Sequence, residues 1–144
     1  MIIDAFKMLD YAEIELANGL GFEHWGLSCG VVNVLGMMEN SGTYWTLRKE
    51  GAVVCIGGYS QLYTGVCEAA FFPSRQFVDS PRLALLAVKE RVRGWANTFR
   101  RVQMNCRSDK KFIRFAEHLG FEKEGVLRKF SPDGTDHVLM AIVR

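Results

Sequence analysis

The first forty residues carry apolar side chains at the spacing of helices. Within residues 4–18 these side chains form one stripe opposite charged ones, which predicts a helix that is interrupted at Asn18 and Gly19. A second helix is expected over about 23–38, and its three internal glycines weaken that pattern. The N-terminal part is therefore predicted to be helical.

From residue 44 onward the pattern alternates between strands and helices. The predicted strands cover residues 44–47, 52–59, 66–72, 102–105, about 122–130 and about 136–143. One helix is expected from Pro81, capped by Asp79 or Ser80. Another follows Ser108 or Asp109 and ends at Gly120. We expect turns at 50–51 and 131–134, and one single domain over residues 1–144.

Composition and charge narrow the class of protein. Hydrophobic residues make up 49% of the 144 residues and charged residues 24%, which is the usage of a globular domain rather than a disordered one. The net charge of +2 is too small to indicate nucleic acid or a membrane surface. No apolar run reaches the roughly 20 residues of a membrane span, and the acidic N-terminus is unlike a signal peptide. We therefore expect a cytoplasmic protein.

The cysteines and histidines show no metal-binding pattern. Four cysteines are scattered through apolar contexts, which favours reduced, buried thiols: Cys29, Cys55, Cys67 and Cys106. No metal site is expected. His118 suits the C-terminal end of its helix, and His24 is expected in packing. His137 is expected to be exposed, with a place in an acceptor cleft as the alternative.

Two segments together carry the pattern of a cofactor site. The segment GVCEAAFFPSRQFVD (65–79) is a strand that ends in Phe71-Phe72-Pro73, and a later strand ends at Asn105 before a helix that closes with Leu119-Gly120-Phe121. This order, over nearly the whole chain, resembles the GNAT acetyltransferase superfamily. The resemblance implies an α/β fold with a mixed, mostly antiparallel, twisted sheet, splayed central parallel strands and helices on both faces. The family's first strand would be missing or reduced to residues 1–3.

The resemblance also implies a cosubstrate, acetyl-CoA, and an amine acceptor, either a small molecule or a protein. The strand 66–72 would hold the pantetheine arm through its backbone, and Asn105 would bond that arm or the splayed main chain. The remaining cofactor-binding residues would be Phe71, Phe72, Gln76, Ser80, Arg82 and Lys110. Gln76 to Arg82 would face the pyrophosphate, and Lys110 the adenosine 3′-phosphate. A solvated helix face is the alternative for Lys110.

The pyrophosphate loop departs from the family's pattern. A [Q/R]-x-x-G-x-[G/A] loop offers backbone N–H groups to phosphate, and here Asp79 and Pro81 stand where its small residues belong. Pro81 lacks an N–H and Asp79 repels phosphate, so the alternative is that residues 79–81 are simply a helix cap. The Tyr that acts as general acid in the family is here Ala116.

Two residues are candidates for proton transfer. Glu68, in the middle of an apolar strand, would deprotonate the acceptor ammonium directly or through water. The alternative is a structural pairing of Glu68 with an Arg of a neighbouring element. Tyr59 is expected to replace the missing Tyr, with Tyr63 as the other choice.

The N-terminal motifs are similar to those of small GNAT-like proteins of tailed phages. The similar positions are Asp10-Tyr11-Ala12-Glu13-Ile14, Tyr44-Trp45, Gly51, Ile56-Gly57-Gly58 and Phe72-Pro73-Ser74. This resemblance implies an alternative function, a non-catalytic role in virion assembly or protein interaction. The partners would then be phage structural proteins, and the protein would be located in the host cytoplasm or in the virion. A homodimer is a further alternative. No membrane partner is expected, and nucleic acid is disfavoured.

Overall fold

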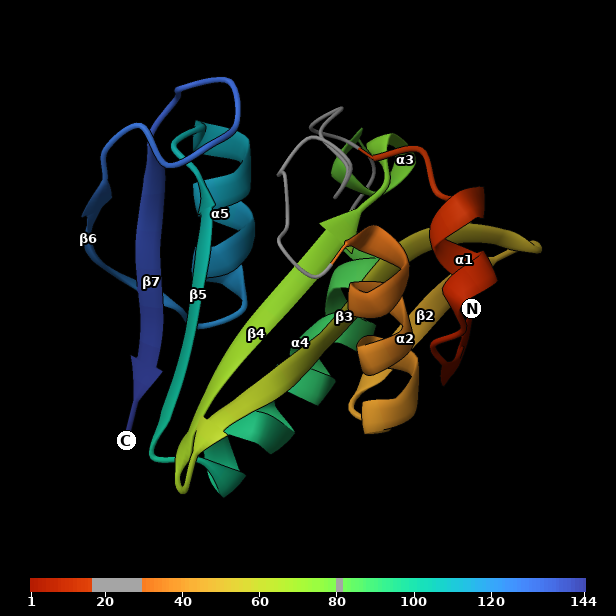
Figure 1. Ribbon diagram of the computed structural model, residues 1–144, viewed down its shortest axis with the longest axis horizontal. Coiled ribbons are helices and arrows are strands. Elements are labelled where there is room, and N and C mark those ends of the chain that lie inside the picture. Colours follow the sequence, from red (N-terminus) through yellow and green to blue (C-terminus); the bar gives the residue numbers. More distant parts are fainter. Residues whose placement is uncertain (17–29, 80–81) are drawn as a thin grey trace. The chain divides into compact units, whose positions relative to one another are not determined.

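A seven-stranded sheet in the order β1-β2-β3-β4-β5-β7-β6 organises the computed structural model of the protein, which describes residues 1–16, 30–79 and 82–144 (Figure 1). The strands are β1 (Ile2–Ala5), β2 (Tyr44–Lys49), β3 (Ala52–Tyr63), β4 (Val66–Pro73), β5 (Arg101–Arg107), β6 (Glu122–Leu127) and β7 (His137–Val143). The helices are α1 (Met8–Glu13), α2 (Val31–Ser41), α3 (Arg75–Asp79), α4 (Arg82–Thr98) and α5 (Lys110–His118).

The predicted fold class is confirmed. Strands β4 and β5 are a parallel pair, while the pairs β1–β2, β2–β3, β5–β7 and β6–β7 are antiparallel. The predicted tight turn joins β2 to β3, with positive φ angles at Glu50 (51°) and Gly51 (82°). The predicted cap of α5 is Asp109, whose carboxylate accepts a hydrogen bond from the backbone N–H of Lys111 at 2.8 Å.

The N-terminal prediction is wrong in detail. Residues 2–5 form β1, which pairs with β2 from Ile2↔Arg48 to Ala5↔Trp45, and α1 covers only Met8–Glu13. The Asp10 carboxylate accepts the backbone N–H of Lys7 at 2.9 Å and so fixes where the helix begins. The second helix, α2, begins at Val31 rather than near residue 23, and residues 17–29 lie outside the described part of the chain.

The described residues group into two compact units. Unit 1 comprises Met1–Ser60 and Phe71–Ala84, and unit 2 comprises Gln61–Ala70 and Leu85–Arg144. The strands β3 and β4 each contribute residues to both units. The single domain over residues 1–144 stays a prediction.

A buried carboxylate anchors α1 to β2 in unit 1. Asp10 is 7% exposed, and besides the N–H of Lys7 it accepts the Thr46 hydroxyl at 2.8 Å and the Arg48 guanidinium at 2.7 Å. Arg48 also reaches Glu13 at 2.8 Å, and this bond raises the pKa of the guanidinium. Because three donors replace the water that Asp10 loses on burial, the charge is tolerated there.

Two aromatic side chains of β2 cover adjacent glycines of β3. In the register, Tyr44 lies opposite Gly58 and Trp45 opposite Gly57. A Cβ atom at Gly58 would lie 2.5 Å from Cγ of Tyr44 and 2.6 Å from the backbone oxygen of Thr43. The Tyr44 hydroxyl lies 2.9 Å from the Ser60 hydroxyl, which fixes the ring over the glycine. The glycines therefore make room for the rings.

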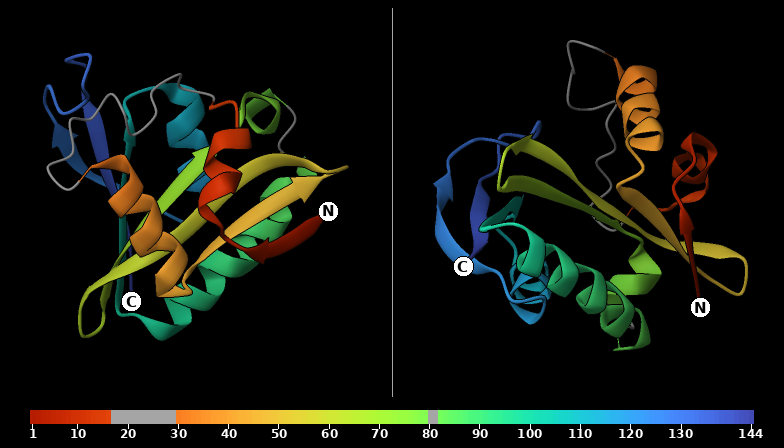
Figure 2. Two further views of the ribbon diagram at one scale, coloured as in Figure 1. Left: turned by 45° about the vertical axis from the view of Figure 1, so that its right-hand side comes forward. Right: turned by 90° about the horizontal axis from the view of Figure 1, so that it is seen from below.

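The longest ladder of unit 2 joins β5 to β7 through seven residue pairs, from Arg101↔Val143 to Arg107↔His137. Val102 and Met104 are buried on one face of β5, and alternation places Arg101, Gln103, Asn105 and Arg107 on the other. Figure 2 shows α5 and the unit 2 part of α4 together on one side of these strands. One face of β5 thus belongs to the core, and the other is free to carry polar side chains.

We expect Gly58→Ala to destabilise the protein, because a methyl group has no room between Tyr44 and the Thr43 backbone. The loss should be about 1–3 kcal/mol of unfolding free energy, measured by urea denaturation. Gly94→Ala is the matched control, since a Cβ atom at this position of α4 meets nothing within 4 Å. That change should stabilise the helix by up to about 1 kcal/mol. Equal effects of the two substitutions would contradict the packing described.

Candidate functional site

The parallel ladder between β4 and β5 is short. It comprises three pairs within the described residues, Val66↔Arg101, Cys67↔Val102 and Glu68↔Gln103. Both strands continue past its end, β4 to Pro73 and β5 to Arg107. The backbone groups of Ala69 and Ala70 that face this side therefore lie outside the parallel ladder.

Polar side chains gather on one face of unit 2 where the ladder ends. Glu68 of β4 lies opposite Gln103 of β5, Asn105 is two residues further along β5, and His137 of β7 contacts Asn105. Neighbouring strands lie about 4.8 Å apart and residues two apart on a strand about 6.6 Å, so these side chains share one small area. The structure thus brings together two predicted residues, Glu68 and Asn105, that are 37 positions apart in the sequence.

The Glu68 carboxylate is half-buried, and no side chain in the described ranges pairs with it. The nearest cation along the ladder, Arg101, instead bonds both carboxylate oxygens of Glu124, at 3.0 and 2.5 Å. This pairing raises the pKa of Arg101 and lowers that of Glu124. Arg101 also donates to the Gln103 side chain at 2.9 Å. The alternative of a structural Glu68–Arg pair is therefore not found among the described residues.

Asn105 and His137 form a hydrogen-bonded pair across β5 and β7. Nδ1 of His137 lies 2.7 Å from Oδ1 of Asn105, and the imidazole is 6% exposed. The expectation that His137 is exposed is wrong, because the first residue of β7 packs beneath the Phe130 ring, with 5.0 Å between ring centroids. Burial, and to a lesser extent the positive charge of Arg107, lowers the pKa of His137, while Asp133 acts in the opposite direction.

The turn between β6 and β7 is tied to Arg107, the last residue of β5. Arg107 bonds Asp133 at 2.8 Å, and the Thr135 hydroxyl donates to the same carboxylate at 2.6 Å. Together they hold the pKa of Asp133 below its usual value. The predicted turn itself is confirmed, since the N–H of Gly134 donates to the carbonyl of Ser131 at 2.8 Å.

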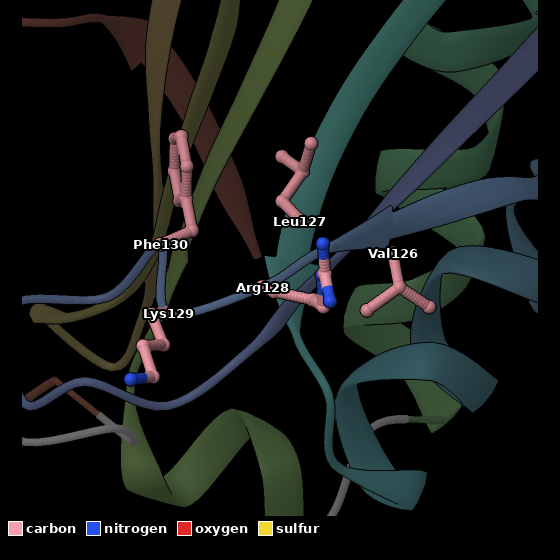
Figure 3. A pocket seen from close by; sticks show the side chains of 5 residues that line it. All are labelled: Val126, Leu127, Arg128, Lys129 and Phe130. Atoms are coloured by element: carbon pink, nitrogen blue, oxygen red, sulfur yellow. The ribbon is translucent and has the colours of Figure 1, made fainter.

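A shallow hollow of about 560 Å³ lies beside this turn. It is lined by Val126, Leu127, Arg128, Lys129 and Phe130, which Figure 3 shows as sticks. Apolar side chains and two cations share the lining, and Phe130 also contacts His137. No sequence pattern pointed to this hollow, because it is made by the end of one strand and the turn that follows.

Five predicted site residues lie in unit 1: Tyr59, Phe71, Phe72, Gln76 and Arg82. Phe71 and Phe72 are half-buried at the end of β4, where Phe71 faces the Trp45 ring and Phe72 meets the Tyr11 ring edge-on. Tyr59 is on β3, and its backbone oxygen accepts the Thr43 hydroxyl. Gln76 and Arg82 are exposed.

The segment expected to be a phosphate-binding loop is partly helical. Residues 75–79 form α3, which begins where the Ser74 hydroxyl accepts the N–H of Phe77 at 3.1 Å. Gln76 therefore lies on a helix, and its predicted contact with the pyrophosphate stays a prediction. Ser80 and Pro81 lie outside the described residues, so their predicted roles stay predictions.

The remaining candidates are in unit 2. Lys110 is the exposed first residue of α5, so its predicted contact with the adenosine 3′-phosphate stays a prediction. Ala116, at the position of the family's Tyr, is fully buried on the same helix. Tyr63, the alternative to Tyr59, is 62% exposed at the end of β3.

The described cysteines, Cys55, Cys67 and Cys106, are free thiols, as predicted. Cys29 lies outside the described residues. Burial raises the pKa of all three, to about 11 for both Cys67 and Cys106. Among the described residues, no group of three or more His, Cys, Asp or Glu side chains is arranged to hold a metal ion. None of the described helices is both long and apolar enough to span a bilayer.

Known structures share this fold. No protein-family model and no curated protein sequence matches the chain. Ard1 from Thermoplasma volcanium superposes with a TM-score of 0.72 at 17% identity, over 99% of this chain and 96% of that one. An acetyltransferase of the GNAT family from Bacillus anthracis gives 0.68 at 15% identity, over 98% and 93%. Microcin C7 self-immunity acetyltransferase MccE, in complex with acetyl-CoA and AMP, gives 0.61 at 15%, over 80% and 72%. The chain therefore has the fold of the GNAT acetyltransferases.

Stability should depend on pH through His137. The unfolded imidazole has a pKa near about 6.5, and the folded one is lower. As the pH falls below that value, the unfolded state takes up the proton first, so the unfolding free energy should fall between about pH 7 and pH 5. His137→Asn keeps a neutral donor at the position of Nδ1 and should show a shallower slope in urea titrations. An unchanged slope would contradict this assignment.

Proposed function

We propose that the protein transfers an acetyl group from acetyl-CoA to an amine. One observation carries the proposal, a half-buried Glu68 carboxylate without a described partner at the point where the β4–β5 ladder ends. The fold shared with acetyltransferases supports it by analogy. A paired glutamate would indicate a structural role, whereas an unpaired one in a partly buried position is suited to accept a proton.

Glu68 would act as the general base. An amine is protonated at neutral pH, so its nitrogen must lose a proton before its lone pair can attack the thioester carbonyl. Glu68 takes that proton directly or through water. The new C–N bond then forms and the C–S bond breaks. The thiolate of CoA takes up a proton, for which Tyr59 is the proposed donor, and the nitrogen releases its second proton, which restores the Tyr59 hydroxyl through water.

The residues at the end of the ladder fit the amide-rich pantetheine arm. The backbone of β4 offers donors and acceptors there, and Asn105 offers a side-chain amide. Phe71 and Phe72 would supply apolar contact for the arm, and Lys110 a charge for the adenosine phosphate. Gln76, Ser80 and Arg82 are proposed as the pyrophosphate contacts, with Gln76 carried by the short helix α3.

A second candidate is a non-catalytic interaction protein with the same fold, for which phage structural proteins are the proposed partners. The helix α3 in place of a glycine-rich loop and the buried Ala116 favour this function. It would place the protein in the host cytoplasm or the virion. An acetyltransferase, by contrast, must bind acetyl-CoA.

Acetyl-CoA should therefore raise the melting temperature. A ligand at 100 times its Kd stabilises the native state by about 2.7 kcal/mol, which amounts to several degrees for a chain of this size. Differential scanning fluorimetry with acetyl-CoA up to millimolar concentration measures the shift, with ATP as the control for a generic polyphosphate effect. No shift would refute the acetyltransferase and leave the interaction protein.

Glu68→Gln should lower turnover about 100-fold or more without changing the melting shift, because the amide keeps the size of the side chain and loses the basic oxygen. Release of CoA in the presence of a primary-amine panel gives the rate. Glu122→Gln, at an exposed position of β6, is the matched control and should keep full activity. Unchanged turnover in Glu68→Gln would exclude Glu68 as the base.

A further inference from the structure

We propose that His137 is a positioning residue that orients Asn105 toward the pantetheine arm. This inference rests on the proposed function. Nδ1–H of His137 would donate to Oδ1 of Asn105, and the amide nitrogen of Asn105 would then present its two N–H donors away from β7. The residue itself makes no contact with the reacting atoms.

The hydrogen bond fixes which end of the amide faces the ligand. Asn105 can turn about its side-chain bond and exchange its oxygen for its nitrogen, which converts a donor into an acceptor. If Nδ1 of His137 carries the proton, it can donate only to the amide oxygen of Asn105, 2.7 Å away, so only the orientation with Oδ1 toward His137 is compatible with this bond. Within the described ranges no bond ties Nδ2 of Asn105, so that group is available. The carbonyl groups of a pantetheine arm require such donors.

The surroundings of His137 favour the neutral form of the imidazole and fix the position of its ring. Its ring is 6% exposed and packs against Phe130. Arg107 is opposite His137 in the register and disfavours a second positive charge there. The start of β7 is bonded to the end of β5, because the N–H of Ser108 donates to the carbonyl of Asp136 at 3.1 Å. Asp136 is the residue before His137. A neutral ring has one N–H, and the Asn105 oxygen selects Nδ1 for it.

A pair of variants tests this directly. In His137→Asn the amide nitrogen can occupy the place of Nδ1, whereas in His137→Gln it reaches toward the place of Nε2. Both side chains are neutral amides, so they differ mainly in where the donor lies. We expect His137→Gln to weaken acetyl-CoA binding about tenfold and His137→Asn less than twofold, by isothermal titration calorimetry. His118→Gln, at an exposed position of α5, is the control for loss of a histidine.

A second ligand separates positioning from a general structural role. Adenosine 3′,5′-bisphosphate lacks the pantetheine arm, so its affinity should be the same in the wild type and in His137→Gln. In an Asn105→Ala background, His137→Gln should cause no further loss of acetyl-CoA affinity, because His137 acts through Asn105.

The outcomes distinguish this inference from the function on which it rests. If the wild type binds no acetyl-CoA, both fall. If the wild type binds and His137→Gln binds equally well, only the role of His137 is refuted. Equal weakening of both ligands, or additive losses in the double variant, would likewise overturn it. The ¹⁵N chemical shifts of His137 should show the Nδ1–H tautomer, and an Nε2–H tautomer would contradict the proposal.

Discussion

The early end of the parallel ladder between β4 and β5 is the constraint on which the proposed site depends. Three residue pairs join β4 to β5, and both strands then continue without further pairs in this ladder. The same point decides the position of Glu68, the last paired residue of β4, and of Asn105, the first polar residue of β5 beyond the ladder. The antiparallel ladder with β7 brings His137 next to Asn105.

Much of the fold could be predicted because local signals agree with the tertiary structure. Gly51, Asp109 and Gly134 mark turns and a cap by chemistry that holds in any context. The predicted N-terminal helix begins too early because Asp4 and Ala5 pair with Thr46 and Trp45 of β2, a partner that apolar spacing alone does not reveal. Similarly, α3 is too short for periodicity to reveal.

Only part of the site could be predicted. The order of elements put Glu68 and Asn105 on two strands of one sheet, and the register places Glu68 opposite Gln103, two residues before Asn105. The burial of His137 was not predicted, because it comes from packing against Phe130 beside the turn over residues 131–136, a contact that the one-dimensional pattern does not show. A single hydrogen bond between two neighbouring strands, such as that of His137 with Asn105, leaves no pattern in the sequence.

The burial of Cys67 has a chemical consequence for the proposed acetyl transfer. A thiolate next to a thioester would capture the acyl group by exchange and hold the enzyme in an unproductive acylated form. Cys67 precedes Glu68 in β4, so the alternation of the strand turns its fully buried thiol toward the core face, and burial raises the pKa of that thiol to about 11. The residue next to the proposed base in the chain thus keeps its sulfur away from the acyl group, and the alternation of β4 contributes to chemical selectivity as well as to the core.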